Sequence, residues 1–237
     1  MTVIISGSPR KENSLCRKYA EKIALAAGTE YKIYEAGYWH IDYCTACEKC
    51  METGYCALRS GDDFDRIAED IRTADAVILA SPVYCGNISA QLKTLIDRMV
   101  SELHVMSLLG RPAIALAVSE GSYHSEAAEY ITKILEYCGA SVLSSLAIDN
   151  SSRKVENEEA LLRAASLLKE ALTPGYEPAV SERTRLWFKA QGARYKYLIQ
   201  LSEFLPECVG EARRWEAQGY MNRSIDDVLK LRYNITT

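Results

Sequence analysis

The sequence lacks the features that would place it on nucleic acid or in a membrane. Its 28 lysine and arginine residues are outnumbered by 32 aspartate and glutamate residues, which gives a formal net charge of -4. Nucleic-acid binding calls for a basic face, so this charge balance argues against it. The longest apolar run, Ala113 to Val118, is far too short to span a bilayer. Because no secretory signal precedes the first apolar run, we expect a soluble cytoplasmic protein.

Two nucleotide-binding signatures are absent as well. The segment from Ser6 to Ser14 reads SGSPRKENS, which has neither the G-K-[ST] ending of a Walker A loop nor the G-x-G-x-x-G dinucleotide pattern. The chain holds only three histidines, and no pair of histidines or carboxylates is arranged for general acid-base chemistry. We therefore predict no catalytic acid or base among the side chains.

What the chain does have is a concentration of cysteine. Four cysteines fall within thirteen residues, and the first three share the C-x2-C-x2-C opening of ferredoxin-type sequences. Structural zinc usually draws on two C-x2-C pairs a dozen or more residues apart, and a reducing cytoplasm disfavours disulfides. The spacing favours an iron-sulfur site, with zinc and free thiols as open alternatives. The predicted metal ligands are Cys44, Cys47, Cys50 and Cys56. The scattered cysteines, expected to be buried, are Cys16, Cys85, Cys138 and Cys208.

Short apolar runs alternate with helical patterns along the first 173 residues. This alternation predicts right-handed βαβ crossovers and an α/β fold with a doubly wound parallel sheet. Five strands suit the flavodoxin-like order 2-1-3-4-5. The expected strands cover residues 3–5, 31–34, 76–80, 113–118 and 142–148. The expected helices cover residues 15–26, 64–72, 90–109, 127–137 and 158–172.

A helical C-terminal extension is expected to follow the sheet. The segment from Thr173 to Pro178 contains two prolines and a glycine, which break the last helix and indicate a linker. We therefore divide the chain into a domain of residues 1–173, with a cysteine loop at about residues 36–60, and an extension of residues 174–237. Within the extension we predict a helix over residues 183–204. A short helix is predicted to start at Ser224, with Asp227 completing a capping box.

The loop after the first predicted strand has the composition of a phosphate site. In a doubly wound sheet, ligands bind beyond the carboxyl ends of the strands where the strand order reverses. Gly7 allows the backbone to approach a ligand closely, and Arg10 supplies a guanidinium near a helix N-terminus, where an anion is favoured. Asn13 is the expected helix cap. The candidate phosphate contacts are Ser8, Arg10, Asn13 and Ser14.

The loop after the third predicted strand is suited to the other end of the same ligand. Tyr84 offers a ring face for a planar heterocycle, and the backbone around Gly86 and Asn87 offers hydrogen bonds to its polar edge. With the segments GSPR and SPVY-x-GN-x-SAQLK-x-x-IDR, the chain resembles the NAD(P)H-dependent FMN reductase family of the flavodoxin-like superfamily. With its four cysteines it resembles, more specifically, an iron-sulfur flavoprotein.

The resemblance implies a set of FMN contacts. The phosphate would lie on the first loop and the isoalloxazine on the second, while a third contact region would follow the fourth strand. In this family a tryptophan often stands where this chain has Cys85. The implied contacts are Ser8, Arg10, Asn13, Ser14, Pro82, Val83, Tyr84, Cys85, Gly86, Asn87, Ser119 and Gly121.

Together these features predict a redox flavoprotein in which FMN exchanges electrons with a [4Fe-4S] cluster. Such a pair would connect a one-electron donor such as ferredoxin to a two-electron acceptor. One alternative is an NAD(P)H-dependent FMN or quinone reductase without a cluster. Another is a binding or interaction protein clipped by zinc. The resemblance also implies a homodimer or homotetramer, in which a neighbouring subunit would bring the cluster close to FMN.

Overall fold

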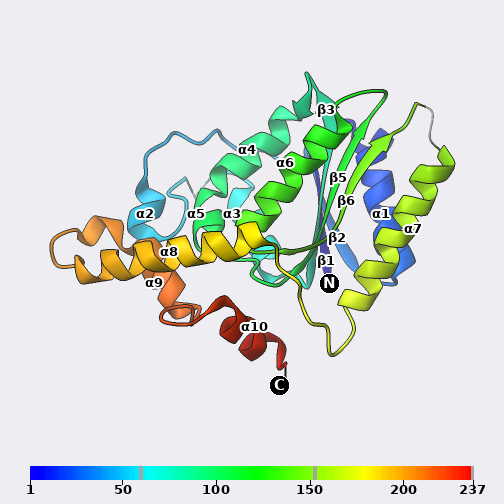
Figure 1. Cartoon of the computed structure of the whole chain (residues 1–237). Helices are drawn as coiled ribbons and strands as arrows, with labels where there is room; N and C mark the ends of the chain where they lie inside the picture. The colour runs from blue at the N-terminus through cyan, green and yellow to red at the C-terminus, as the bar shows by residue number, and fades with distance from the viewer. Residues whose placement is uncertain (59–60, 152–153, 236–237) are drawn as a thin grey trace.

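A sheet with five parallel strands lies between two layers of helices (Figure 1). The computed structural model describes residues 1–58, 61–151 and 154–235. The parallel strands follow the order β2-β1-β3-β5-β6, which in sequence order is the predicted 2-1-3-4-5. The doubly wound fold is therefore confirmed. Its parallel strands are β1 (Thr2–Ser6), β2 (Tyr31–Glu35), β3 (Ala76–Tyr84), β5 (Pro112–Ser119) and β6 (Ser141–Asp149).

The predicted count of five strands is wrong, because the sheet has a sixth. Strand β4 (Asn87–Ile88) pairs antiparallel with the end of β3. Cys85 and Gly86 form the turn between them with φ values of 50° and 76°, the backbone that a two-residue hairpin requires. A strand of two residues is too short to show the alternation of apolar residues by which strands are recognised.

The apolar strands send side chains to both faces of the sheet. Ile4 belongs to one hydrophobic core, while Val3 and Ile5 belong to the other. Helices α1 (Leu15–Ala27) and α7 (Lys154–Ala171) cover the first face.

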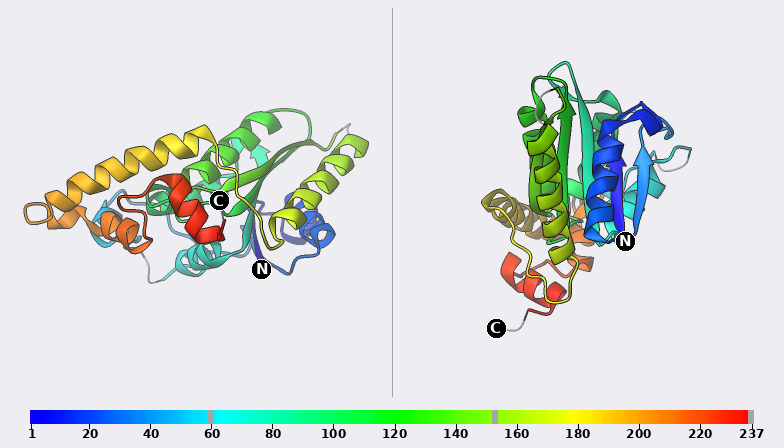
Figure 2. Two further views of the ribbon diagram at one scale, coloured as in Figure 1. Left: turned by 60° about the horizontal axis from the view of Figure 1, so that its bottom comes forward. Right: turned by 90° about the vertical axis from the view of Figure 1, so that its right-hand side faces the viewer.

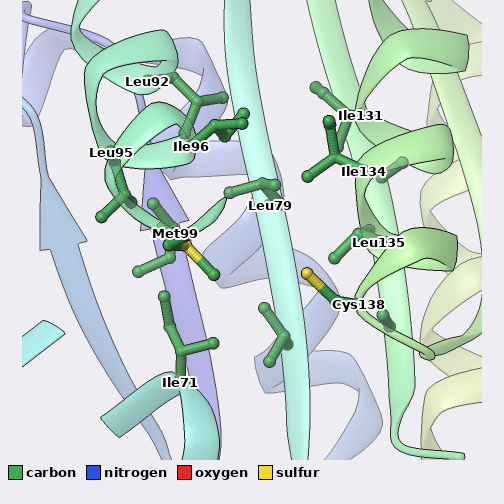
Figure 3. Packing of buried hydrophobic residues seen from close by; sticks show 14 of the residues in the cluster. Ile71, Leu79, Leu92, Leu95, Ile96, Met99, Ile131, Ile134, Leu135 and Cys138 are labelled. Carbon is green, nitrogen blue, oxygen red and sulfur yellow. The ribbon is translucent and has the colours of Figure 1, made fainter. Parts of the chain in front are cut away.

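The second face is covered by four helices. Figure 3 shows side chains of α4, such as Leu92, and of α6, such as Ile131, on either side of Leu79 in β3. Both faces are thus covered, as a sheet of continuously apolar strands requires. The helices of this face are α3 (Phe64–Thr73), α4 (Ala90–Arg98), α5 (Val100–His104) and α6 (His124–Tyr137).

The single helix predicted over residues 90–109 is wrong, because the chain breaks it after α4. Helix α5 follows α4 closely and ends at His104, after which residues 105–110 form turns. Met106 lies in this turn with a φ of 51° and is completely buried. The apolar pattern continues through backbone that is no longer helical, so residue spacing alone did not mark the end of the helix.

After α7, three further α-helices of the described chain lie around one end of the sheet (Figure 2). Residues 172–181 carry no helix or strand, which agrees with the predicted linker, whereas the division into two domains stays a prediction. The capping box of Ser224 and Asp227 is confirmed, and the predicted helix over 183–204 ends at Gln200. Among the described residues, no helix has both the length and the apolar content needed to cross a membrane. The three helices are α8 (Glu182–Gln200), α9 (Gly210–Ala217) and α10 (Ile225–Tyr233).

The start of α4 provides a test of how the fold is held together. Ser89 caps α4 by accepting a hydrogen bond from the Leu92 N–H, and its hydroxyl donates to the Gly7 carbonyl at 2.6 Å in a buried position. We expect Ser89→Ala to lower the free energy of unfolding by about 2–4 kcal/mol, because it removes both a cap and a buried hydrogen bond. The exposed cap variant Ser224→Ala is the control, with an expected loss of about 1 kcal/mol. Urea unfolding of both proteins measures the difference, and equal losses would contradict the importance of the bond to Gly7.

Candidate functional site

A crevice of about 150 Å³ lies at the carboxyl ends of β1, β3 and β5. The loops after β1 and β5 and the last residues of β3 line it, so the structure brings together the three segments that the sequence predicted to hold one ligand. This is the edge at which a doubly wound sheet binds its ligands. The lining residues are Ser8, Arg10, Leu15, Cys16, Pro82, Val83, Tyr84, Val118, Ser119 and Glu120.

Half of the predicted FMN contacts lie outside the lining of this cavity. Ser14 is buried and caps α1 by accepting a hydrogen bond from the Arg17 N–H. The prediction that Asn13 caps the helix is therefore wrong. Asn13 ends the short 3-10 helix η1 (Lys11–Asn13), whereas Ser14 has the extended backbone that a cap residue adopts. The predicted contacts outside the lining are Asn13, Ser14, Cys85, Gly86, Asn87 and Gly121.

The tip of the β3-β4 hairpin projects beside the crevice. Tyr84 is 39% exposed, and Tyr123, from the loop after β5, is 55% exposed. A Cβ added to Gly86 would lie 3.5 Å from the Tyr123 ring, so the two loops touch at this point. Cys85 is exposed, and the expectation that it is buried is wrong because it occupies a hairpin turn. Exposed aromatic rings beside a cavity offer faces on which a planar group can stack.

Ser81 and Ser89 join the loop after β1 to β3 and to the start of α4. The Ser81 hydroxyl accepts a hydrogen bond from the Ser89 N–H at 2.9 Å, and Ser89 in turn donates to Gly7. A Cβ on Gly7 would lie 2.7 Å from Leu92 Cβ, which leaves no room for a side chain. The predicted role of Gly7 was close approach to a ligand, but its contacts show that it lets the first loop pack against α4.

A second cavity, of about 370 Å³, lies at the other end of α4. All four clustered cysteines line it, together with residues of α4 and α5, so the structure brings the predicted ligands to one place. Within the described ranges, no three cysteine, histidine or acidic side chains converge on the position of a single ion. Four thiols on one cavity are a donor set that either zinc or an iron-sulfur cluster takes. The cavity is lined by Cys44, Thr45, Ala46, Cys47, Glu48, Cys50, Met51, Cys56, Ala57, Leu58, Asp97, Arg98, Val100 and His104.

The backbone of the cysteine loop is folded against its local preference. Ala46 and Glu48 have φ values of 51° and 57°, a left-handed conformation that costs a non-glycine residue roughly 1–2 kcal/mol. The short helix α2 (Lys49–Thr53) follows and ends at Gly54, whose φ is 79°. Contacts elsewhere in the molecule must hold this shape.

The thiols of the loop lie in different electrostatic surroundings. A hydrogen bond from the backbone N–H of Lys49 lowers the pKa of Cys47, which favours its thiolate. Burial raises the pKa of Cys50, and the nearby charge of Glu211 raises it further. On the wall of the crevice at the strand ends, burial raises the pKa of Cys16 to about 12, so this thiol stays protonated.

Arg98 holds both ends of the cysteine loop from the last residue of α4. Its side chain is completely buried and pairs with Asp62 at 2.6 Å. The same guanidinium donates to the carbonyl of Asp42 at 3.0 Å and to that of Leu58 at 2.8 Å. Its Nε donates to the Cys56 sulfur at 3.0 Å.

Comparison with known proteins shows the family of this chain. Residues 1–153 match the family model described as NADPH-dependent FMN reductase. The chain belongs to this family. It is 37% identical over 138 residues to an iron-sulfur flavoprotein of Archaeoglobus fulgidus, in an alignment that spans 57% of this chain and 62% of the relative. It is 41% identical over 99 residues to an iron-sulfur flavoprotein of Methanosarcina thermophila, across 40% of this chain and 50% of the relative. The chain thus matches about half to three fifths of the length of these relatives.

Two solved structures share the fold of this family member. A flavone reductase superposes with a TM-score of 0.58 at 16% identity, over 76% of this chain and 66% of the other. A flavoenzyme described as an NAD(P)H:acceptor oxidoreductase, from Paracoccus denitrificans, gives a TM-score of 0.53 at 16% identity, over 71% and 94%. At such identities the likeness establishes the fold alone.

Several residues of the two sites were not predicted from the sequence. Arg98 is the last residue of the SPVY-x-GN-x-SAQLK-x-x-IDR segment. Arginine side chains are rarely buried, and the spacing of the apolar residues around Arg98 did not indicate that its side chain is. Glu120 follows β5 and lines the crevice at the strand ends, where the rule for strand ends could have found it. Cys16 was expected to be buried, which is confirmed, but its position on the wall of the crevice was not.

The Arg98 and Asp62 pair has a measurable effect on stability. Asp62→Asn leaves the Arg98 charge buried without its partner, and we expect a loss of about 3–5 kcal/mol in the free energy of unfolding. The exposed pair of Lys93 and Asp97 is the control, because Asp97→Asn is expected to cost no more than about 1 kcal/mol. Urea unfolding at pH 7 compares the two variants, and a small loss for Asp62→Asn would contradict the anchoring role of Arg98.

The same pair predicts that the free energy of unfolding depends on pH. Burial alone would raise the pKa of Asp62, but hydrogen bonds from the Asp42 N–H, from Arg98 and from the Phe64 N–H outweigh burial and lower it. A lowered pKa adds stability above the unfolded value of about 3.9 and loses it as the pH falls through the folded value. We therefore expect the stability difference between wild type and Asp62→Asn to shrink below about pH 4. A difference that stays constant to pH 2 would contradict this.

Proposed function

We propose that this protein is an FMN-dependent oxidoreductase in which a [4Fe-4S] cluster exchanges electrons with FMN. The observation that carries the proposal is the pairing of two cavities at opposite ends of one helix, one at the strand ends and one lined by four cysteines. Family membership supports the flavin, and the names of the relatives support the cluster. The proposed cluster ligands are Cys44, Cys47, Cys50 and Cys56.

The flavin crevice has a charged end and an aromatic end. Ser8 is buried beside Arg10, whose guanidinium would pair with the phosphate of FMN. Tyr84 and the hairpin tip would flank the isoalloxazine, which leaves an open side for a second substrate. No side chain is assigned proton transfer.

Helix α4 links the two proposed cofactor sites. Ser89 at its start binds the loops of the flavin crevice, and Arg98 at its end binds the cysteine loop. Nine residues separate them, which is about 14 Å along a helix axis. When bound, the cluster carries one electron at a time and FMN one or two. The Arg98 N–H on the Cys56 sulfur would stabilise added negative charge on the cluster.

The donor and the assembly complete the proposal. A ferredoxin-like protein would supply single electrons, and NAD(P)H is the alternative donor. We propose a cytoplasmic homodimer or homotetramer, in which a neighbouring subunit could shorten the path from cluster to flavin.

A second candidate is an NAD(P)H-dependent FMN or quinone reductase without a cluster. Two features of the family match favour it. The description of the family names NADPH, and the matched residues 1–153 include all residues that line the flavin crevice. In this case NAD(P)H would stack on the open side of the flavin. Rapid anaerobic reduction of the flavin by NADH or NADPH is expected for this candidate and is not required by the cluster proposal.

Elemental analysis tests the proposal directly. Anaerobically purified protein is expected to contain FMN with about four irons and four sulfides per chain, and to show flavin bands over a broad absorption shoulder. Cys50→Ser is expected to lose iron and sulfide but keep the flavin, because the two cavities are separate, and Cys138→Ser is the control away from both. Flavin without iron in the wild type would favour the second candidate, and a colourless zinc protein would contradict both.

Arg10 provides a test of the flavin site. Arg10→Ala removes a guanidinium from the charged end of the crevice, and we expect FMN binding to weaken roughly tenfold, as for the loss of an exposed charge-assisted hydrogen bond. Riboflavin lacks the phosphate, so its affinity is expected to stay the same. Lys18→Ala, an exposed change of equal charge on α1, controls for long-range electrostatics. Fluorescence titration measures all three proteins, and an equal loss for riboflavin would show that Arg10 does not bind the phosphate.

A further inference from the structure

We propose that α9 of the C-terminal extension is a clamp that holds the cysteine loop in its folded shape. The clamp consists of Gly210, Glu211 and Arg214, on the first two turns of α9. They contact α2 or the wall of the cysteine cavity. The inference rests on the proposed function only in so far as the clamped cavity holds a cluster, because the contacts themselves are independent of any cofactor.

Gly210 places the start of α9 directly on the backbone of α2. A Cβ on Gly210 would lie 2.2 Å from the Glu52 carbonyl oxygen and 2.5 Å from the Gly54 nitrogen. Both neighbours are backbone atoms, so they could not move aside without changing the shape of the loop. Glycine is therefore required here by close approach of two main chains.

Arg214 holds the end of α2 with several groups at once. It donates to the Gly54 carbonyl at 2.5 Å, and its guanidinium lies 4.1 Å from the centre of the Tyr55 ring. It also forms two hydrogen bonds to the carboxylate of Glu102, at 3.2 and 3.0 Å. Glu102 is buried in α5 and also binds Arg72 at 2.9 Å. The guanidinium thus joins α2 to α5, one of the helices that cover the second face of the sheet.

Glu211 places a buried carboxylate behind the wall of the cysteine cavity. It is 1% exposed and lies 3.0 Å from the Nδ1 atom of His104, which lines the cavity. It also accepts a hydrogen bond from the Tyr195 hydroxyl at 3.2 Å. Through this contact α9 orients a side chain of the cavity wall, much as second-sphere carboxylates orient metal-site histidines.

The extension is itself anchored next to the cavity. The Trp187 indole donates to the Leu103 carbonyl, and the Gln218 amide donates to the Val105 carbonyl, so α8 and α9 are both attached to the α5 segment. The family match ends at residue 153, before the extension begins. The clamp therefore comes from a part of the chain outside the family model, and it explains how a loop with unfavourable backbone angles keeps its shape.

Two pairs of matched variants test the clamp in the full-length protein. Gly210→Ala introduces the backbone clash, whereas Gly192→Ala in α8 meets nothing closer than 3.9 Å. Arg214→Ala removes the contacts to α2, whereas Arg213→Ala removes an exposed guanidinium from the neighbouring position. Mass spectrometry of metal-free protein, labelled with iodoacetamide for increasing times, gives the alkylation rates of Cys50 and Cys44 in the same sample. For the as-purified protein, the rate of iron loss to a chelator is measured.

We expect Gly210→Ala and Arg214→Ala to raise the alkylation of half-buried Cys50 about tenfold relative to exposed Cys44, because the loop opens more often. Iron loss is expected to accelerate in the same two variants and to stay unchanged in the controls. Arg214→Lys keeps the charge opposite Glu102 and is expected to restore part of the protection. Equal Cys50 rates in all variants would overturn the clamp, and so would equal increases in the controls. A wild-type protein without iron would overturn the proposed function and leave the alkylation test valid.

Discussion

The structure around the cysteine cavity depends on the burial of one charged group, the Arg98 guanidinium at the end of α4. A buried charge is tolerated only when it is fully paired, and Arg98 meets this condition with Asp62, two loop carbonyls and the Cys56 sulfur. Because its partners come from both ends of the cysteine loop, satisfying the charge also closes the loop. At the other end of α4, Ser89 binds Ser81 and Gly7 beside the crevice at the strand ends, so one helix helps to position both candidate sites.

Charge pairing continues from this helix into the C-terminal extension. Glu102 lies between Arg72 and Arg214, and Glu211 contacts His104 and Tyr195. These carboxylates are almost completely buried. Removing either of them would leave its buried partners unpaired and lower the stability of the fold. The cysteine loop, whose backbone is unfavourable by itself, is thus held from two sides, by Arg98 within the family fold and by α9 outside it. Its shape is a property of the whole molecule.

Much of the fold could be predicted because its signals are local or depend on chain order. Apolar runs such as residues 113–118 mark buried strands, and strict alternation with helices determines a doubly wound sheet. The strand-end rule then predicts which loops meet, and Ser8, Tyr84 and Ser119 do meet. Strand β4 and the break after α4 were not predicted, because two residues carry no periodicity and the apolar pattern continues across the break.

The sequence by itself determined the sheet order, the crevice at the strand ends and the four cysteines, because residue type and spacing along the chain are sufficient for each of them. Only the tertiary structure decided which distant groups surround the cysteines. Nothing in the residue spacing around Arg98, Arg214 or Gly210 distinguishes them from ordinary surface positions. Their roles arise from contacts 36 to 160 residues away along the chain, as between Arg98 and Asp62 or between Arg214 and Gly54. Such contacts exist only once the chain has folded, and no local pattern encodes them.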